Sequence, residues 1–186
     1  MITASGIKKI FYAETSVITA DLTAFALKTL LGGPSVKEVP NVHGDTWNLE
    51  ESEASATPYK NALNGKVYRR DVEAGEIKAN YTIGQYSYDQ KGDLLGGTVI
   101  QKGTGAGATT IGWKRGDFAD VKKTMVFLTK DDQYCVFPYA STNARETNAD
   151  KAIGLSVSAT PLEPPTTGIA SEYWFDKAEV DAATSV

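Results

Sequence analysis

The chain has 186 residues, with 23 acidic and 19 basic side chains and a net charge of −4. This length suits one domain with an ordinary core, and the mild acidic excess differs from the basic stripe of a dedicated nucleic-acid binder. The single cysteine, Cys135, excludes an internal disulfide, and its place in an apolar run predicts a buried thiol.

Neither a membrane span nor a secretion leader is visible in the sequence. No apolar run reaches the roughly 18 residues that cross a bilayer, and no basic segment precedes a short apolar one near the N-terminus. We therefore expect a soluble protein that is not exported and has no membrane partner.

The N-terminal region is expected to hold an arm and then a helix. An apolar patch at Ile7, Ile10 and Phe11 fits either a first strand or an arm, and we take about residues 1–18 as an N-terminal arm. Thr19–Gly33 has the pattern of a helix capped by Thr19 or Asp21 and ended by glycines. Its expected apolar stripe is Leu22, Phe25, Ala26, Leu30 and Leu31.

An acidic strand and a long excursion follow. Trp47, Leu49 and Glu51 alternate with polar neighbours, which predicts a strand within 45–53. Residues 54–74 are longer than an ordinary connection, and Asn64-Gly65 is a hairpin signal. We predict an ordered ribbon that projects from the domain and is received by another surface. The candidate contact residues on it are Tyr59, Lys60, Lys66, Tyr68, Arg69, Arg70 and Asp71.

The stretch from Gly75 to Ile100 has the clearest pattern in the chain. Residues 77–83 alternate as a half-buried strand does. A short helix with Ser87 or Asp89 as its cap is then expected, ending at Gly96-Gly97, and a strand restarts at Thr98. So short a connection predicts that the helix plugs the end of an antiparallel sheet.

The rest of the chain, nearly half of its length, is expected to be mostly antiparallel sheet. The glycine-rich run 103–108 lacks the Gly-Lys-Ser/Thr ending of a phosphate loop and precedes a strand, which predicts a hairpin tip. Residues 123–130 and 133–138 are expected to pair around Asp131-Asp132. Residues 141–150 have the composition of a polar connector. Strands are expected at 152–160 and 169–175, and 176–186 should form a C-terminal tail.

No group of residues has the pattern of a catalytic, metal or cofactor site. His43 is the only histidine and lies beside turn residues, so we expect a surface side chain. Glu50 and Glu51 face opposite sides of a strand. Three basic pairs (Arg69-Arg70, Lys114-Arg115 and Lys122-Lys123) have acidic neighbours, which favours a solvated or intersubunit face over a phosphate track. Core or interface roles are favoured over a sugar platform for Tyr86, Tyr88, Trp113, Tyr173 and Trp174. We expect no enzyme and no cofactor.

The order of these elements resembles the tail tube proteins of long-tailed phages, the major tail proteins. The segments that carry the likeness cover about half of the chain: 19–33, the acidic strand GDTWNLEESEAS (44–55), YKNALNGKVYRRDVEAG (59–75) and IKANYTIGQYSYDQKGDLLGGTV (77–99). The family is also similar to the tube proteins of contractile tails and of type VI secretion.

This resemblance implies a mainly β fold, a β-sandwich or partly closed barrel of antiparallel strands with one or two flanking helices. It implies hexameric rings that stack into a conduit for the genome, with residues 54–74 reaching the neighbouring ring and the termini serving as arms. The implied partners are other copies of the chain, tape measure, tail terminator and baseplate or tip proteins, and DNA in transient passage. The implied location is the virion tail, after assembly in the host cytoplasm.

Two other readings stay open. A β-sandwich binding or adhesion module would use similar strands, and so would another virion structural protein, such as a decoration protein. A tube also suggests a bore that is neutral to acidic, because acidic side chains give DNA phosphates no ion pairs.

Overall fold

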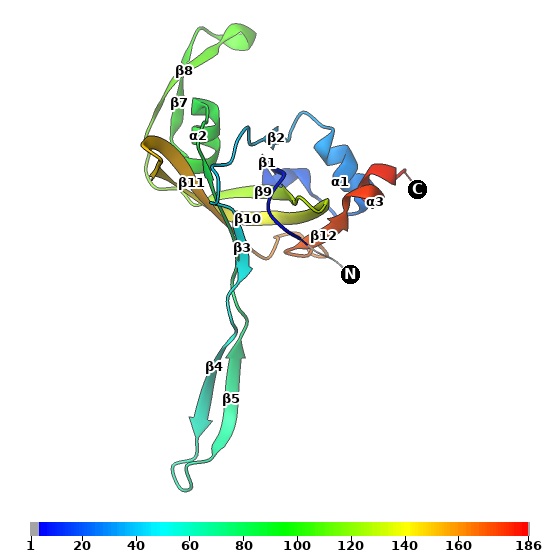
Figure 1. The fold of residues 1–186 in the computed structure, drawn as a ribbon, viewed down its shortest axis with the longest axis vertical. Helices are drawn as coiled ribbons and strands as arrows, with labels where there is room; N and C mark the ends of the chain where they lie inside the picture. The colour runs from blue at the N-terminus through cyan, green and yellow to red at the C-terminus, as the bar shows by residue number, and fades with distance from the viewer. Residues whose placement is uncertain (1–3, 186) are drawn as a thin grey trace.

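Antiparallel strands dominate the computed structural model, which describes residues 4–185 (Figure 1). The predicted mainly β fold with flanking helices is confirmed. The strands are β1 (Lys9–Ala13), β2 (Lys37–Glu38), β3 (Asn48–Glu51), β4 (Ser55–Lys60), β5 (Val67–Glu73), β6 (Ile77–Ile83), β7 (Thr98–Lys102), β8 (Thr109–Lys114), β9 (Val121–Leu128), β10 (Gln133–Ala149), β11 (Ala152–Pro161) and β12 (Tyr173–Asp176). The helices are α1 (Ala24–Leu31), α2 (Tyr88–Leu95) and α3 (Lys177–Ala182), with 3-10 turns η1 (Thr15–Val17) and η2 (Gly105–Gly107).

One large sheet organises the molecule, in the order β2-β1-β9-β10-β11-β6-β3, with β12 paired to β10. Strand β10 joins its two parts, because its beginning pairs with β9 and β12 and its end pairs with β11. A register shift between Phe137 and Ala140, next to Pro138, allows the strand to bend there. The prediction of a polar connector at 141–150 is therefore wrong, since these residues continue β10 up to Ala149.

The sheet wraps around a core on its inner face. Side chains from β1, β6, β9, β10 and β11 meet there, and Tyr81, Phe127 and Phe137 are almost fully buried. Cys135 lies in this core, so the predicted buried thiol is confirmed. Burial raises the pKa of its thiol well above the ordinary range.

A second core covers the outer face of β9 and β10, where α1 and α3 pack. Helix α1 begins at Ala24 with Thr23 as its cap, so Thr19 and Asp21 are not the caps. Its most buried residue is Leu27, whereas Phe25 of the expected stripe is 39% exposed.

Both ends of the described chain are folded against the sheet rather than extended as an arm or a tail. Strand β1 sits between β2 and β9, which replaces the predicted arm from Lys9 onward. The expected tail forms α3, which buries Val180, and the expected last strand begins only at Tyr173. Residues 1–3 and 186 lie outside the described residues.

The central stretch has the predicted order of strand, helix and strand. Ser87 caps α2 by accepting a hydrogen bond from the Gln90 N–H, and the Gln90 side chain accepts from the Ser87 N–H. Helix α2 also contacts β9 and β10, and its Asp93 accepts from the Tyr12 hydroxyl at 3.0 Å. The helix thereby closes one end of the wrapped sheet.

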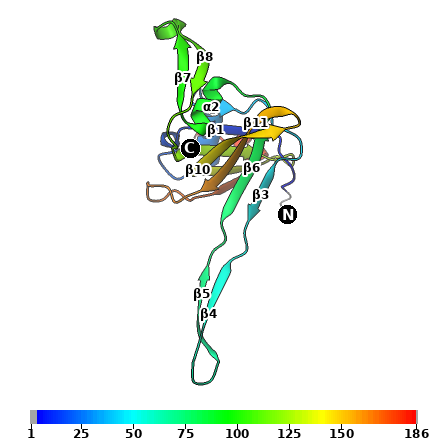
Figure 2. The same ribbon diagram turned by 90° about the vertical axis from the view of Figure 1, so that its left-hand side faces the viewer.

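Two hairpins leave this body in opposite directions, β4–β5 at one end of the longest axis and β7–β8 at the other (Figures 1 and 2). Each forms a two-stranded sheet of its own. The predicted projecting ribbon and the predicted hairpin tip at 103–108 are both confirmed.

Candidate interaction surfaces

The ribbon, residues 54–74, carries all seven predicted contact residues on β4, β5 and the loop between them. Its strands run on from β3 and β6 through a joint at Ser52 and Glu76. The Ser52 N–H donates to the Glu76 carbonyl oxygen at 3.0 Å, and the Glu76 N–H donates to Ser52 Oγ at 2.8 Å. Beyond this joint, β4 and β5 pair only with each other within the described chain.

Three of the predicted residues form a small cluster on the ribbon. The Arg69 guanidinium donates two hydrogen bonds to the Asp71 carboxylate, at 2.8 and 2.9 Å, and lies 5.2 Å from the centre of the Tyr59 ring. Tyr59 is directly opposite Arg69 in the pairing of β4 with β5. This arrangement fixes a flat aromatic and cationic surface on one side of the ribbon.

The other predicted residues are exposed and form no cluster. Tyr68 is 70% exposed, and Arg70 lies opposite Pro58. Lys60 is the last residue of β4, and Lys66 is the last residue of the connection 61–66, which is longer than the two-residue turn that Asn64-Gly65 suggested. Gly65 still adopts a positive φ of 69°.

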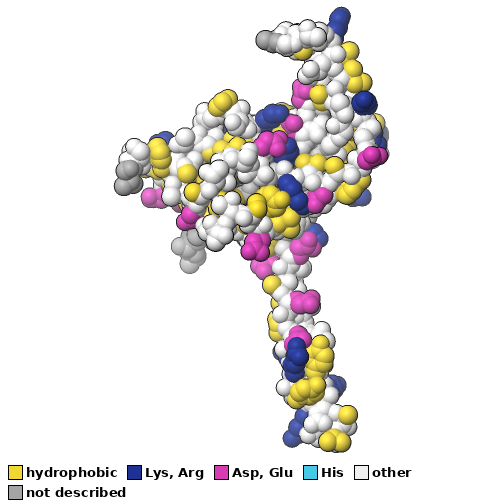
Figure 3. Space-filling model, turned by 180° about the vertical axis from the view of Figure 1, so that it is seen from behind, with side chains coloured by type: hydrophobic (Ala, Val, Ile, Leu, Met, Phe, Trp, Pro, Cys, Tyr) yellow, Lys and Arg dark blue, Asp and Glu magenta, His cyan; other side chains and the backbone are white. Residues whose placement is uncertain are grey.

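Sequence reasoning missed the apolar residues of the ribbon. Leu63 is 95% exposed, and Val67 and Val72 are also exposed. Figure 3 shows hydrophobic and basic side chains side by side along this part of the molecule. A two-stranded sheet is marginally stable in water, and exposed apolar groups in such a sheet mark a contact surface. The signal was present in the sequence, because Leu63, Val67 and Val72 interrupt an otherwise polar excursion.

The opposite hairpin is anchored to the body by a cluster of charged and aromatic side chains. Lys91 Nζ lies 4.1 Å from the centre of the Trp113 ring and 2.5 Å from Glu146 Oε1. Arg115 lies over the same ring, at 5.4 Å, and donates to Glu146 Oε2 at 2.9 Å. The Trp113 indole N–H donates to the Gly96 carbonyl oxygen. Helix α2, β8 and β10 are therefore tied together at this point.

Some of the predicted basic and aromatic residues belong to this cluster, and others lie elsewhere. Arg115 pairs with Glu146 rather than with Asp117, whereas Lys122 pairs with Asp120 as the sequence suggested. Tyr86 and Trp113 lie near Lys91, and Tyr88 begins α2, the helix that carries Lys91. Tyr173 and Trp174 lie on β12, so the five candidate aromatics are divided between two places.

A four-stranded layer, β3-β6-β11-β10, has a free backbone edge on each side. Within residues 4–185, β3 pairs only with β6, and residues 143–149 of β10 pair only with β11. The outer face of the layer is polar, and its central row is uncharged, consisting of Asn48, Asn80, Ser158 and Asn143. The rows on either side carry charge, with Arg145 beside Ser156 in one and Lys78 beside Glu50 in the other.

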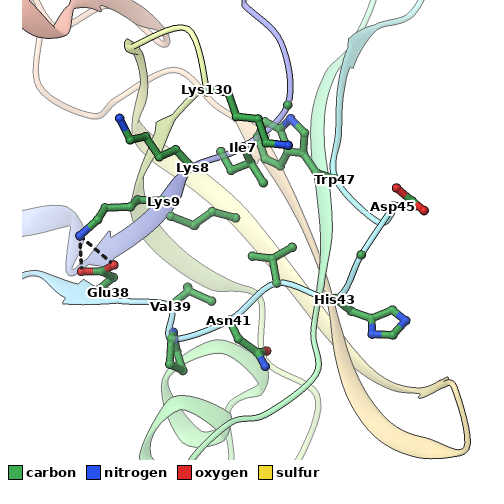
Figure 4. A pocket seen from close by; sticks show the side chains of 15 residues that line it. Ile7, Lys8, Lys9, Glu38, Val39, Asn41, His43, Asp45, Trp47 and Lys130 are labelled. Atoms are coloured by element: carbon green, nitrogen blue, oxygen red, sulfur yellow. Dashed lines mark hydrogen bonds and ion pairs between the residues drawn. The ribbon is translucent and has the colours of Figure 1, made fainter.

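A cleft of about 450 Å³ lies between β1 and the segment that leads to β3. Figure 4 shows Lys130 and Trp47 toward one end of it and the ion pair between Lys9 and Glu38 at the other. Lys8, which also lines it, pairs with Asp132 at 2.8 Å. Ion pairs with Glu38 and Asp132 thus partly neutralise Lys9 and Lys8 at the cleft.

Within residues 4–185, His43 and the pair Asp131-Asp132 do not form a catalytic or metal-binding arrangement. His43 Nε2 lies 3.2 Å from Asp150 at the surface, and Asp131-Asp132 form the turn between β9 and β10. Within the described range, no three His, Cys, Asp or Glu side chains could jointly hold a metal ion. No helix in residues 4–185 is long and apolar enough to cross a membrane.

No family model matches the chain, and no curated protein matches it either. The candidate contact surfaces are therefore chosen from the structure alone. They are the ribbon, the opposite hairpin and the two free sheet edges.

Proposed function

We propose that the protein is a structural subunit whose copies close into rings and stack into a hollow tube, as in a phage tail tube. The observation that carries this proposal is the ribbon, which exposes Leu63, Val67, Tyr68 and Val72 on a two-stranded sheet without support from the rest of the described chain. Burying these side chains against another copy would stabilise the ribbon and remove apolar surface from water.

The free edges of the β3-β6-β11-β10 layer support closure into a ring. All three pairings in this layer are antiparallel, so β3 runs opposite to β10. A copy that places its β3 beside the free end of a neighbour's β10 therefore continues the antiparallel alternation. Such a contact joins two different surfaces and closes into a ring when the rotation between copies permits.

The polar face of the same layer suits the bore of a conduit. Its central row carries amide and hydroxyl groups without charge. Such groups give DNA phosphates no ion pairs, and ion pairs supply most sequence-independent affinity for DNA. The neighbouring rows add two cations, Arg145 and Lys78, and Lys78 is paired with Glu76. We place this face toward the bore, where a passing genome would meet few cations.

The proposal includes the partners and the location that go with a tail tube. These are other copies of the chain, tape measure, tail terminator and baseplate or tip proteins, and a place in the virion tail after assembly in the host cytoplasm. These partners and this location are proposed only as part of the tube, and a protein that forms no tube would contradict them.

Replacing Tyr59–Val72 with a short glycine linker tests the role of the ribbon. We expect a folded monomer or single ring in place of stacked tubes, because the core contains no residue of this segment. Electron microscopy and sedimentation of the concentrated protein measure the outcome, and circular dichroism checks the fold. Complete tubes from the shortened chain would show that the ribbon does not stack the rings. A full-length chain that stays monomeric when concentrated would contradict self-assembly itself.

A further inference from the structure

Exposed large hydrophobic side chains gather at two opposite ends of the molecule. Among the described residues there are twelve of them, and five lie on the ribbon: Tyr59, Leu63, Val67, Tyr68 and Val72. Four more lie on α2, on the β7–β8 hairpin and on the loop 115–120 that follows it: Tyr88, Ile100, Ile111 and Phe118. We call this second set of elements the α2–hairpin surface.

We propose that the α2–hairpin surface of one copy receives the ribbon of the next copy, so that copies join end to end along the long axis. This inference rests on the proposed self-assembly and adds the receiving surface to it. The two surfaces point away from each other in one molecule (Figures 1 and 2). A single chain therefore cannot bring them together, but a second copy can.

The exposed apolar residues are grouped at the two ends and are not spread singly over the surface, which indicates contact between copies. Only three of the twelve lie elsewhere, namely Phe25, Ile153 and Trp174. Phe118 is 89% exposed and lies beside the end of α2, near Gly97 and Trp113. Apolar groups concentrated in this way mark association surfaces, and two different surfaces at opposite ends give a contact that repeats without limit along one direction.

The two ends carry different patterns of charge. Lys60, Lys66 and Arg70 of the ribbon take part in no ion pair within the described part of the chain. On the α2–hairpin surface the same holds for two acids, Asp89 and Asp117, and for two bases, Lys102 and Lys114. Opposite charges across a contact select the partner and its orientation more than they raise affinity. The unpaired cations of two ribbons would repel each other, whereas Asp89 and Asp117 of the α2–hairpin surface can pair with them.

Disulfide trapping between two engineered copies tests the contact. Cys135 is buried, so an introduced surface cysteine is the reactive thiol of each variant. A Tyr68→Cys copy is mixed with an Ile111→Cys copy under mild oxidation, and the products are separated without reductant. We expect roughly tenfold more mixed dimer than in a control mixture of Tyr68→Cys with Ile153→Cys, because docking raises the local thiol concentration.

The outcomes separate this inference from the proposed function. Tubes that form without the bond between positions 68 and 111, or with a bond between two copies of position 68, overturn the receiving surface but leave self-assembly standing. Copies that stay single when concentrated overturn both. In a second test, Ile111→Thr combined with Phe118→Ser should raise the concentration needed for stacking about tenfold, whereas Ile153→Thr should not change it. An unchanged value in the double variant also counts against the receiving surface.

Discussion

Glu146 is the residue on which the anchoring of the β7–β8 hairpin depends most. Its carboxylate accepts hydrogen bonds from Lys91 and Arg115, which belong to two other elements. The hydrogen bond from Lys91, followed by the attraction of both cations, lowers the pKa of Glu146 below its ordinary value. Lys91 is largely buried, with 11% of its side chain exposed, so its charge needs this partner.

Glu146→Gln should lower the free energy of unfolding by about 1–2 kcal/mol at neutral pH, a figure reduced because 37% of the Glu146 side chain is exposed. The matched control is Glu76→Gln, in an exposed pair with Lys78 at 2.6 Å, where a change under about 0.5 kcal/mol is expected. Urea unfolding measures both variants. Equal losses would show that the Glu146 cluster does not anchor the hairpin.

The same substitution has a pH dependence with a definite sign. A carboxyl group whose folded pKa is lowered stabilises the fold above its ordinary pKa, here 4.5, and this contribution is lost as the pH falls through the folded value. The difference in stability between the natural chain and Glu146→Gln should therefore shrink below pH 4.5. A difference that stays constant with pH would contradict this account.

At the scale of elements, the joint between the ribbon and the sheet leaves no room for a side chain. A Cβ atom on Gly75 would lie 1.7 Å from the Ser52 carbonyl oxygen, which is a backbone atom. The strands leading into the ribbon approach closely here, and the bonds between Ser52 and Glu76 hold them in place. The direction of the ribbon is thus set by a position that only glycine can occupy without movement.

Gly75→Ala should force this joint open at a local cost of about 1–3 kcal/mol and redirect the ribbon. We expect faster hydrogen exchange at the Ser52 amide and loss of stacking in electron micrographs, with the two cores intact. Gly44→Ala is the control, because a Cβ there meets nothing within 4 Å. Unchanged exchange at Ser52 would mean that the joint tolerates the methyl group.

The sequence predicts those elements whose signals are local. The β6-α2-β7 segment carries both an alternating strand and the Ser87 cap, and the ribbon carries a turn glycine at 65. The end of β10 was missed because one face is solvated and the other holds ion pairs, so residues 143–149 look like a connector. Their strand form depends on pairing with β11.

The start of α1 and the contact residues were harder to predict, because they also depend on contacts with distant parts of the chain. Three good capping residues, Thr19, Asp21 and Thr23, lie within one short segment, and burial of Leu22 just before α1 selects the last of them. The polar ribbon residues were found from composition. The receiving surface was not, because Ile100, Ile111 and Phe118 are far apart in the sequence and share one end of the molecule only through the direction that the β7–β8 hairpin takes.

At the scale of the whole molecule, edge-to-edge closure can be tested on β3. The Ser52 N–H donates to the carbonyl oxygen of Glu76, the residue just before β6. Because N–H groups alternate in direction along a strand, the Glu50 N–H points to β6 and the Glu51 N–H points outward. Glu51→Pro should therefore leave the monomer folded but block ring closure, since proline removes an outward donor. Glu50→Pro removes a donor inside the sheet and should instead lower the melting temperature. Analytical ultracentrifugation and thermal unfolding separate the two, and rings formed by Glu51→Pro would exclude this edge.

The continuity of β3 with β4 and of β5 with β6 gives the molecule a mechanical property. A pull on the tip of the ribbon acts along β3 and β6, and β6 is paired with β11. The hydrogen bonds between β6 and β11 therefore share the load in shear. The β7–β8 hairpin has no such continuation, and tension there falls on Gly96-Gly97 and the Trp113 cluster. A chain of such subunits would resist stretching through its ribbons and would yield first at the opposite end.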